Sequence, residues 1–253
     1  MNKNPTQRFS DRVGNYTKYR PGYPAKILNL LKEKCNLTPG SIIADIGSGT
    51  GIFTKFLLDN GNSVVAVEPN PEMRAEAERI LASNKLFSSI TGEAEATTLD
   101  DHSVDIITSA QAFHWFDHEK AKQEFRRILI PKGWVVLVWN ELKTGPSPFL
   151  QAYEDLLTTH STDYGQVDHK LMDAKVVTKF YLPSAFNTAI FSNSQDFDLE
   201  ALKGRLLSSS YAPNASHPNH KPMMAEIEQI FAAHNISGKV RFEYKTQVYY
   251  GRL

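Results

Sequence analysis

The 253-residue sequence has a single cysteine, no excess of charge of either sign and no long hydrophobic run. Cys35 alone cannot form an internal disulfide or a thiolate metal cluster, so we expect a protein of a reducing compartment, by default the cytoplasm. The 28 Lys and Arg residues equal the 28 Asp and Glu residues in number, which argues against a nucleic-acid partner. The longest wholly apolar run, residues 134–139, is too short to cross a bilayer, so no membrane partner is expected.

Short apolar runs alternate with amphipathic helical patterns over the first half of the chain. Runs rich in Val and Ile, bounded by Gly, Asp, Asn or Pro, predict strands at residues 41–46, 63–68, 104–109 and 134–140. Apolar residues at helical spacing predict helices between these strands, and a further helix at residues 25–34 precedes the first one. This alternation predicts an α/β fold with a mainly parallel sheet.

The pattern changes after Asn140. A Gly-Pro-Ser-Pro turn signal at residues 145–148 begins about a hundred residues of helical patterns and polar residues, with a loop-like stretch at 208–222. Residues 240–250 alternate enough to predict a final strand or hairpin. The sequence therefore predicts an N-terminal strap at residues 1–24, an α/β core at 25–142 plus 241–253, and an inserted, mostly helical cap at 143–240.

A Gly-rich turn, Asp45-Ile46-Gly47-Ser48-Gly49-Thr50-Gly51, follows the first strand of the core. Glycines in such a turn let the backbone bend tightly and approach a ligand closely. A phosphate-binding P-loop would continue with Lys and then Ser or Thr, whereas Ile52 and Phe53 stand there. A dinucleotide fingerprint would place its third Gly at position 52, where Ile stands. Such fingerprints tolerate variation, so a nicotinamide-dependent oxidoreductase is the alternative interpretation.

Two acidic residues accompany this turn. Glu68 ends the next predicted strand, where a carboxylate can accept hydrogen bonds from both hydroxyls of a ribose. Asp45 suits a cationic or amino-acid head group better than a phosphate, because like charges repel. The pattern therefore favours an adenosine ligand that has no pyrophosphate.

With DIGSGTG at residues 45–51 and VVAVEPN at 64–70, the sequence resembles the class I S-adenosylmethionine-dependent methyltransferases, most closely the small-molecule group with a ubiquinone/menaquinone-type core. Its lead-in YTKYRP, at 16–21, resembles that of trans-aconitate-methyltransferase-like proteins. The resemblance implies a Rossmann-like, mainly parallel seven-stranded sheet with helices on both faces, the cofactor S-adenosylmethionine and a small-molecule methyl acceptor. A binding protein that holds this cofactor without turnover is a further alternative.

The resemblance also implies which residues hold the cofactor. Arg20 is expected to pair with its carboxylate, Glu68 with its ribose and Glu93 with the adenine amine. The family usually has Asp at position 93, so Glu95 is the alternative contact to adenine. The predicted cofactor-binding residues are Tyr19, Arg20, Asp45, Gly47, Ser48, Gly49, Gly51, Glu68, Pro69, Met73, Glu93, Ala94 and Ala110.

The sequence AQAFHWF at residues 110–116 follows the predicted strand 104–109, at the end where open α/β sheets bind ligands. Its aromatic residues either line a substrate site or pack the start of the next helix. His114 is the best base for a hydroxyl acceptor, whereas a carboxylate acceptor would need only a cation such as Arg205. The predicted catalytic residues are His114 and Gln111, and the predicted substrate residues are Tyr16, Trp115, Trp139, Arg205 and Tyr211.

No metal site is predicted. His217 and His220 are three residues apart, but Pro218 lies between them in a loop-like stretch without a nearby acid. The oligomeric state is left open by the sequence.

Overall fold

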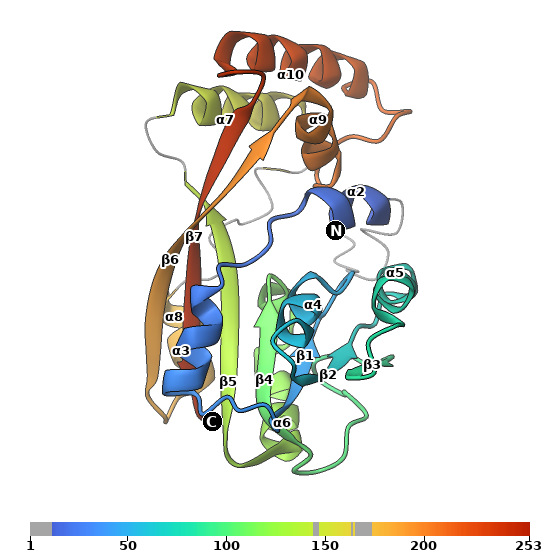
Figure 1. Cartoon of the computed structure of the whole chain (residues 1–253). Coiled ribbons are helices and arrows are strands. Elements are labelled where there is room, and N and C mark those ends of the chain that lie inside the picture. Colours follow the sequence, from blue (N-terminus) through green and yellow to red (C-terminus); the bar gives the residue numbers. More distant parts are fainter. Residues whose placement is uncertain (1–11, 144–146, 163, 165–173) are drawn as a thin grey trace.

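The computed structural model describes residues 12–143, 147–162, 164 and 174–253, which form a seven-stranded sheet with helices around it (Figure 1). The strand order is β3-β2-β1-β4-β5-β7-β6, and β7 alone runs antiparallel to its two neighbours. The predicted mainly parallel, seven-stranded sheet is therefore confirmed. The strands are β1 (Ile42–Ile46), β2 (Ser63–Val67), β3 (Phe87–Ile90), β4 (Val104–Ala110), β5 (Leu129–Leu142), β6 (Phe186–Phe197) and β7 (Val240–Gly251).

Helices cover both faces of the sheet, because successive residues of its central strands point to opposite faces. On β5, Val136 packs with α3 (Lys26–Lys34), α4 (Ile52–Leu58) and α5 (Pro71–Leu81). Val135 and Leu137 pack with α6 (His118–Ile128) and α8 (Ala174–Tyr181) on the other face. This explains why residues 134–139 of β5 form a continuous apolar run, since both faces of the strand are buried.

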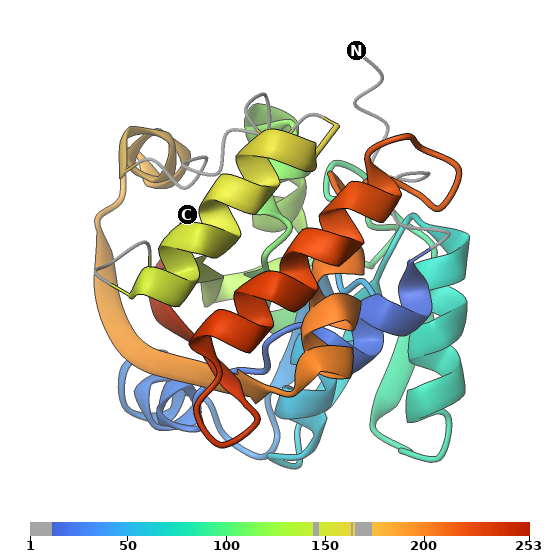
Figure 2. The same cartoon turned by 90° about the horizontal axis from the view of Figure 1, so that it is seen from above.

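A second core lies above the carboxyl ends of the parallel strands. Here α7 (Pro148–His160), α9 (Leu199–Leu207) and α10 (His220–His234) pack on Phe242 and Tyr244 of β7 and Phe197 of β6. Seen from above, α7 and α10 run side by side over the sheet (Figure 2). The short helix α2 (Val13–Tyr19) lies between this cap and the sheet domain (Figure 1).

The predicted cap at 143–240 needs a correction, because part of it belongs to the sheet. Strand β6 pairs with β7 over its full length, from Phe186 opposite Gly251 to Phe197 opposite Val240. Helix α8 packs on the lower core rather than on the cap. The sequence of β6, FNTAIFSNSQDF, is mostly polar because the strand lies at the sheet edge, so its pattern does not predict a strand.

In the described residues, no helix combines the length and the apolar character that a membrane crossing requires.

Candidate active site

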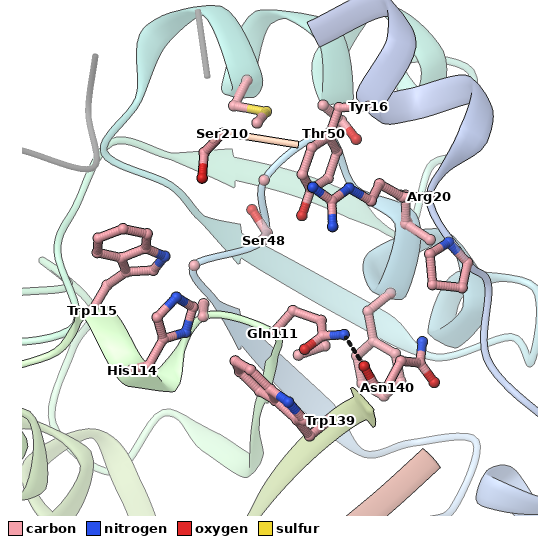
Figure 3. Close-up of a pocket in the computed structure, with 18 of the residues that line it drawn as sticks. Tyr16, Arg20, Ser48, Thr50, Gln111, His114, Trp115, Trp139, Asn140 and Ser210 are labelled. Atoms are coloured by element: carbon pink, nitrogen blue, oxygen red, sulfur yellow. Dashed lines mark hydrogen bonds between the residues drawn. The ribbon is translucent and has the colours of Figure 1, made fainter. Parts of the chain in front are cut away.

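A cavity of about 1340 Å³ lies at the carboxyl ends of β1, β2, β4 and β5, beneath the cap. Pockets for a single small ligand typically measure roughly 300–1,000 Å³. The cavity therefore has room for two ligands. Figure 3 shows Tyr16 and Arg20 on one side of it, and His114, Trp115 and Trp139 on the other.

The Gly-rich turn forms the floor of this cavity, and its glycines serve different purposes. Gly47 has a positive φ of 69°, and a Cβ there would lie 2.5 Å from Cβ of Ala112, so only glycine lets the loops after β1 and β4 meet. Gly49, with φ of 58°, faces open space within the cavity. A ligand can therefore approach the backbone closely at Gly49.

Gly51, which is predicted to bind the cofactor, is not among the residues that line the cavity. It precedes α4, and a Cβ on it would lie 2.9 Å from Cδ1 of Leu81 on α5. Its role is therefore to allow α5 to pack closely against the start of α4.

Asp45, at the end of β1, is only 1% exposed. Its carboxylate accepts hydrogen bonds from the hydroxyls of Thr54, at 2.7 Å, and Thr108, at 2.9 Å. Burial raises the pKa of Asp45 to about 6, although both hydrogen bonds act in the opposite direction. The side chain therefore ties β1 to α4 and β4 below the turn.

Glu68 follows β2 and binds the turn directly. One carboxylate oxygen accepts from the backbone N–H of Gly49 at 2.8 Å and the other from that of Asn70 at 2.9 Å. Burial raises the pKa of Glu68, and these two hydrogen bonds offset part of the effect. Each oxygen keeps a lone pair, so the carboxylate can still accept from ribose hydroxyls.

The two acids considered for adenine differ in their surroundings. The carboxylate of Glu95 accepts a hydrogen bond from the backbone N–H of Asp117, at the start of α6. In the described part of the chain, nothing donates to the carboxylate of Glu93, which is exposed at the cavity. The carboxylate of Glu93 is therefore open to a ligand, and Met73 of α5 also lines the cavity.

The sequence left open whether the aromatic residues after β4 pack in the core or line a site, and both occur. Phe113 is 1% exposed and packs edge-on against Phe180 of α8, so it belongs to the core. The ring of His114 lies 4.6 Å from that of Trp115 and 5.0 Å from that of Trp139, at 90° to the latter. These three rings line the cavity and form an aromatic wall.

The strap reaches the cavity through Arg20. Its Nη2 donates to the carbonyl oxygen of Ser208 at 2.9 Å, and its Cζ lies 4.9 Å from the ring centre of Tyr16. Burial, and then the charge of Arg205, lower the pKa of Arg20. Tyr19, which is also predicted to bind the cofactor, does not line the cavity, because its ring packs on Gly204 of α9.

The cap adds residues that the sequence did not single out. Tyr153 of α7 and Tyr244 of β7 line the cavity with the predicted Arg205 and Tyr211. Tyr153 lies in the apolar stripe of α7, where its position is typical of a core residue and gives no functional signal. Of the hydroxyl-rich stretch 208–213, only Ser210 and Tyr211 line the cavity.

The predicted sites therefore converge on one cavity. All predicted cofactor, catalytic and substrate residues line it except Tyr19 and Gly51. No group of three His, Cys, Asp or Glu side chains within the described ranges could hold a metal ion.

The strand order separates two cofactor classes. The usual dinucleotide-binding sheet has the order 3-2-1-4-5-6, in which the sixth strand lies beside the fifth. Here the antiparallel β7 lies between β5 and β6, so the described residues do not form a second nucleotide-binding half. Ile52 also begins α4 where the third glycine of the fingerprint would stand.

Residues 44–137 match the family model described as "Methyltransferase domain". Over these residues the chain is similar to methyltransferase domains. A methyltransferase-like protein of Schizosaccharomyces pombe, uncharacterized, is 33% identical over 159 residues, which cover 61% of this chain and 59% of that one. The match thus spans about three fifths of that relative, and about half of relatives from mycobacteria.

Solved structures share this fold. A candidate type II methyltransferase from Anaeromyxobacter dehalogenans superposes with a TM-score of 0.68 at 21% identity, covering 92% of this chain and 98% of that one. Phosphoethanolamine N-methyltransferase 2 from Haemonchus contortus, solved with S-adenosylhomocysteine, gives a TM-score of 0.51 at 15% identity, covering 95% and 56%.

The cavity fits S-adenosylmethionine, the cofactor of this class of domain. In the described part of the chain, Ser48 Oγ, Thr50 Oγ1 and Arg20 Nε are buried without a hydrogen-bond partner, and all three residues line the cavity. Buried polar atoms of this kind require a partner from a ligand or water. The amino and carboxylate groups of the methionine part would supply it.

Proposed function

We propose that the protein transfers the methyl group of S-adenosylmethionine to a hydroxyl or carboxylate oxygen of a small-molecule acceptor. The cavity supports this proposal, because its volume of about 1340 Å³ exceeds the need of one ligand. Its lower side carries the residues predicted for the cofactor, and Arg205, Tyr211 and Tyr153 of the cap line the remainder. The neighbour from Haemonchus contortus binds phosphomonomethylethanolamine together with S-adenosylhomocysteine on this fold.

Three charged residues would hold the cofactor. Glu68 would accept from the ribose hydroxyls, Glu93 from the adenine amine, and Arg20 would donate to the carboxylate. Asp45 would position the turn through Thr54 and Thr108 rather than act in the chemistry.

The sulfonium of the cofactor supplies a leaving group that is already activated. The chain therefore has to align the acceptor oxygen and exclude water. The oxygen lone pair forms the new C–O bond as the electron pair of the methyl–sulfur bond passes to sulfur. A hydroxyl acceptor would lose its proton to His114, whereas a carboxylate would need no base.

A reducing compartment such as the cytoplasm is part of this proposal. Burial raises the pKa of the Cys35 thiol to about 12, so this cysteine stays protonated and unreactive.

Parallel calorimetric titrations with S-adenosylhomocysteine, S-adenosylmethionine and NADH test the cofactor. We expect the two sulfur nucleosides to bind and NADH not to bind, and the reverse would refute the proposal. Glu68→Gln should weaken the binding of S-adenosylhomocysteine by roughly 10- to 150-fold, or about 1.5 to 3 kcal/mol, since charge-assisted hydrogen bonds are lost. The control is Glu72→Gln, an exposed acid on α5, which should leave the affinity unchanged.

Turnover separates an enzyme from a protein that only holds the cofactor. Formation of S-adenosylhomocysteine from S-adenosylmethionine is followed by mass spectrometry with a panel of hydroxy and carboxylic acids. We expect acceptor-dependent formation that His114→Ala or Trp139→Ala reduces. Cofactor binding without any acceptor-dependent product would favour the non-catalytic alternative.

A further inference from the structure

Two arginine side chains face the cavity without an acidic partner. Arg20 follows α2, and Arg205 lies on α9 and is only 6% exposed. Their hydrogen bonds reach neutral groups, the carbonyl of Ser208 for Arg20 and the hydroxyl of Ser209, at 3.2 Å, for Arg205. In both guanidinium groups Nε is buried, and no described residue accepts from it.

None of the ion pairs between described residues includes either arginine. The groups around Arg205 are instead the phenol rings of Tyr153, Tyr211 and Tyr244, and the ring of Phe242 at 5.8 Å. The charge of Arg205 also acts on Arg20 and lowers its pKa, so the two cations repel each other. Buried charges without counter-ions are costly, and a ligand anion would relieve that cost.

One anion is not enough for two cations. Under the proposed function, the carboxylate of the cofactor neutralises Arg20 and leaves Arg205 with its charge uncompensated. Tyr153, on α7, is 1% exposed, and no described residue bonds to its hydroxyl group. Both residues line the cavity from the cap side, and Arg205 offers only donors.

We propose that Arg205 and Tyr153 bind a carboxylate group of the methyl acceptor, and that this carboxylate is an anchor that is not itself methylated. We call these two residues the anchor subsite. The inference rests on the proposed function, because the acceptor must share the cavity with the cofactor.

The charge of Arg205 explains why the anchoring carboxylate is not methylated. Methylation of the anchored carboxylate would give a neutral ester and leave Arg205 buried without a counter-ion. A guanidinium also stabilises the carboxylate charge through its hydrogen bonds, which makes the carboxylate a poorer nucleophile. The acceptor therefore carries a second oxygen, which receives the methyl group, in addition to the anchor.

The experiment compares three probes that share a benzene ring, benzoate, benzamide and methyl benzoate, on protein saturated with S-adenosylhomocysteine. Calorimetry should show benzoate binding at least ten times more tightly than either neutral probe. Arg205→Gln should abolish this preference while changing the affinity for S-adenosylhomocysteine by less than about threefold. Equal affinities in the wild type, a preference that persists in Arg205→Gln, or no benzoate binding at about 10 mM would each overturn the proposal.

Arg241→Gln is the matched control, because Arg241 is exposed on β7 and pairs with Asp196 at 2.7 Å. It should keep the full preference for benzoate. Tyr153→Phe removes only the hydroxyl group and replaces Arg205→Gln as the test if that variant does not fold. It should reduce the preference for benzoate several-fold. An unchanged preference would count against the anchor subsite. If the wild type fails to bind S-adenosylhomocysteine, the proposed function fails and not the anchor subsite alone.

Discussion

The side-chain Nε2 of Gln111 donates a hydrogen bond to the backbone oxygen of Asn140 at 3.0 Å, joining the ends of β4 and β5 at the cavity (Figure 3). The bond fixes the orientation of the amide, so that its Oε1 is the atom left to accept from a ligand. Gln111 also has a positive φ of 62°, a conformation that few residues other than glycine adopt. Gln111 is therefore held in one position beside the aromatic wall.

Gln111→Asn tests this position. Asn tolerates the positive φ, but its shorter side chain cannot reach the carbonyl of Asn140. We expect kcat to fall by roughly 3- to 10-fold, the value of one hydrogen bond, in assays with an acceptor from the panel. The affinity for S-adenosylhomocysteine should change by less than about twofold, and a large loss of that affinity would assign Gln111 to the cofactor instead.

The burial of Asp45 predicts a dependence of stability on pH. Its pKa is raised from 3.8 to about 6, so between these values the native state binds more protons than the unfolded state. Stability due to this group is therefore highest at low pH and falls as the pH rises through this window. Asp45→Asn removes the effect. Relative to the variant, the wild type should lose about 2 to 3 kcal/mol from pH 4 to pH 7, at roughly 1.4 kcal/mol per unit.

Urea denaturation of both proteins at several pH values measures this difference. A difference that stays constant with pH would show that Asp45 is ionised equally in both states.

Glu124 should have the opposite pH dependence. Its carboxylate accepts hydrogen bonds from Arg127 at 2.7 Å and from the backbone N–H of Thr97 at 2.8 Å. The bond from Thr97 holds the loop that contains Glu93 against α6. The bonds with Arg127 and Thr97 lower the pKa of Glu124 from 4.5 to about 2. The contribution of Glu124 to the free energy of unfolding is therefore present above pH 4.5 and lost as the pH falls toward 2.

Glu124→Gln should cost on the order of 2 kcal/mol of unfolding free energy at pH 7 and about a quarter of that at pH 2.5, by the same linkage. Chemical denaturation at the two pH values provides the measurement. Glu119→Gln on the same helix is the control, because its pair with Lys179 is exposed and should contribute less than about 1 kcal/mol. An equal loss from both substitutions would contradict the assignment.

The contact between Tyr19 and Gly204 predicts how the strap is attached to the cap. A Cβ at position 204 would lie 1.9 Å from Cε2 of Tyr19, so Gly204→Ala should displace the ring. We expect a loss of about 1 to 3 kcal/mol of stability, as for other overpacked sites, and faster hydrogen exchange in α2.

In a protein that already carries Tyr19→Ala, the further change Gly204→Ala should cost little stability, since the two side chains no longer overlap. Gly14→Ala is the control within α2, because no atom lies within 4 Å of its added Cβ. If Gly204→Ala leaves hydrogen exchange in α2 unchanged, Tyr19 does not attach the strap to α9.

The sequence by itself determined the βαβ core and the cofactor turn, because their signals are local. Strands β1, β2, β4 and β7 begin and end within one residue of the predicted ranges, since a buried strand must be a continuous or alternating apolar run. The glycine spacing and Glu68 likewise lie within one strand–helix–strand unit, β1-α4-β2. The family resemblance then extended these signals to the cofactor.

Tertiary structure alone decided which distant residues share the cavity and which neighbours leave it. Arg20 and Arg205 are 185 positions apart in sequence, and nothing in either segment indicates that their charges meet. Tyr19 and Gly51 belong to the motifs that supply the cavity, yet they pack against Gly204 and Leu81 and do not line it. Edge strand β6 escapes prediction because most of its side chains are polar and nearly all are partly or fully exposed, so no continuous or alternating apolar run marks it.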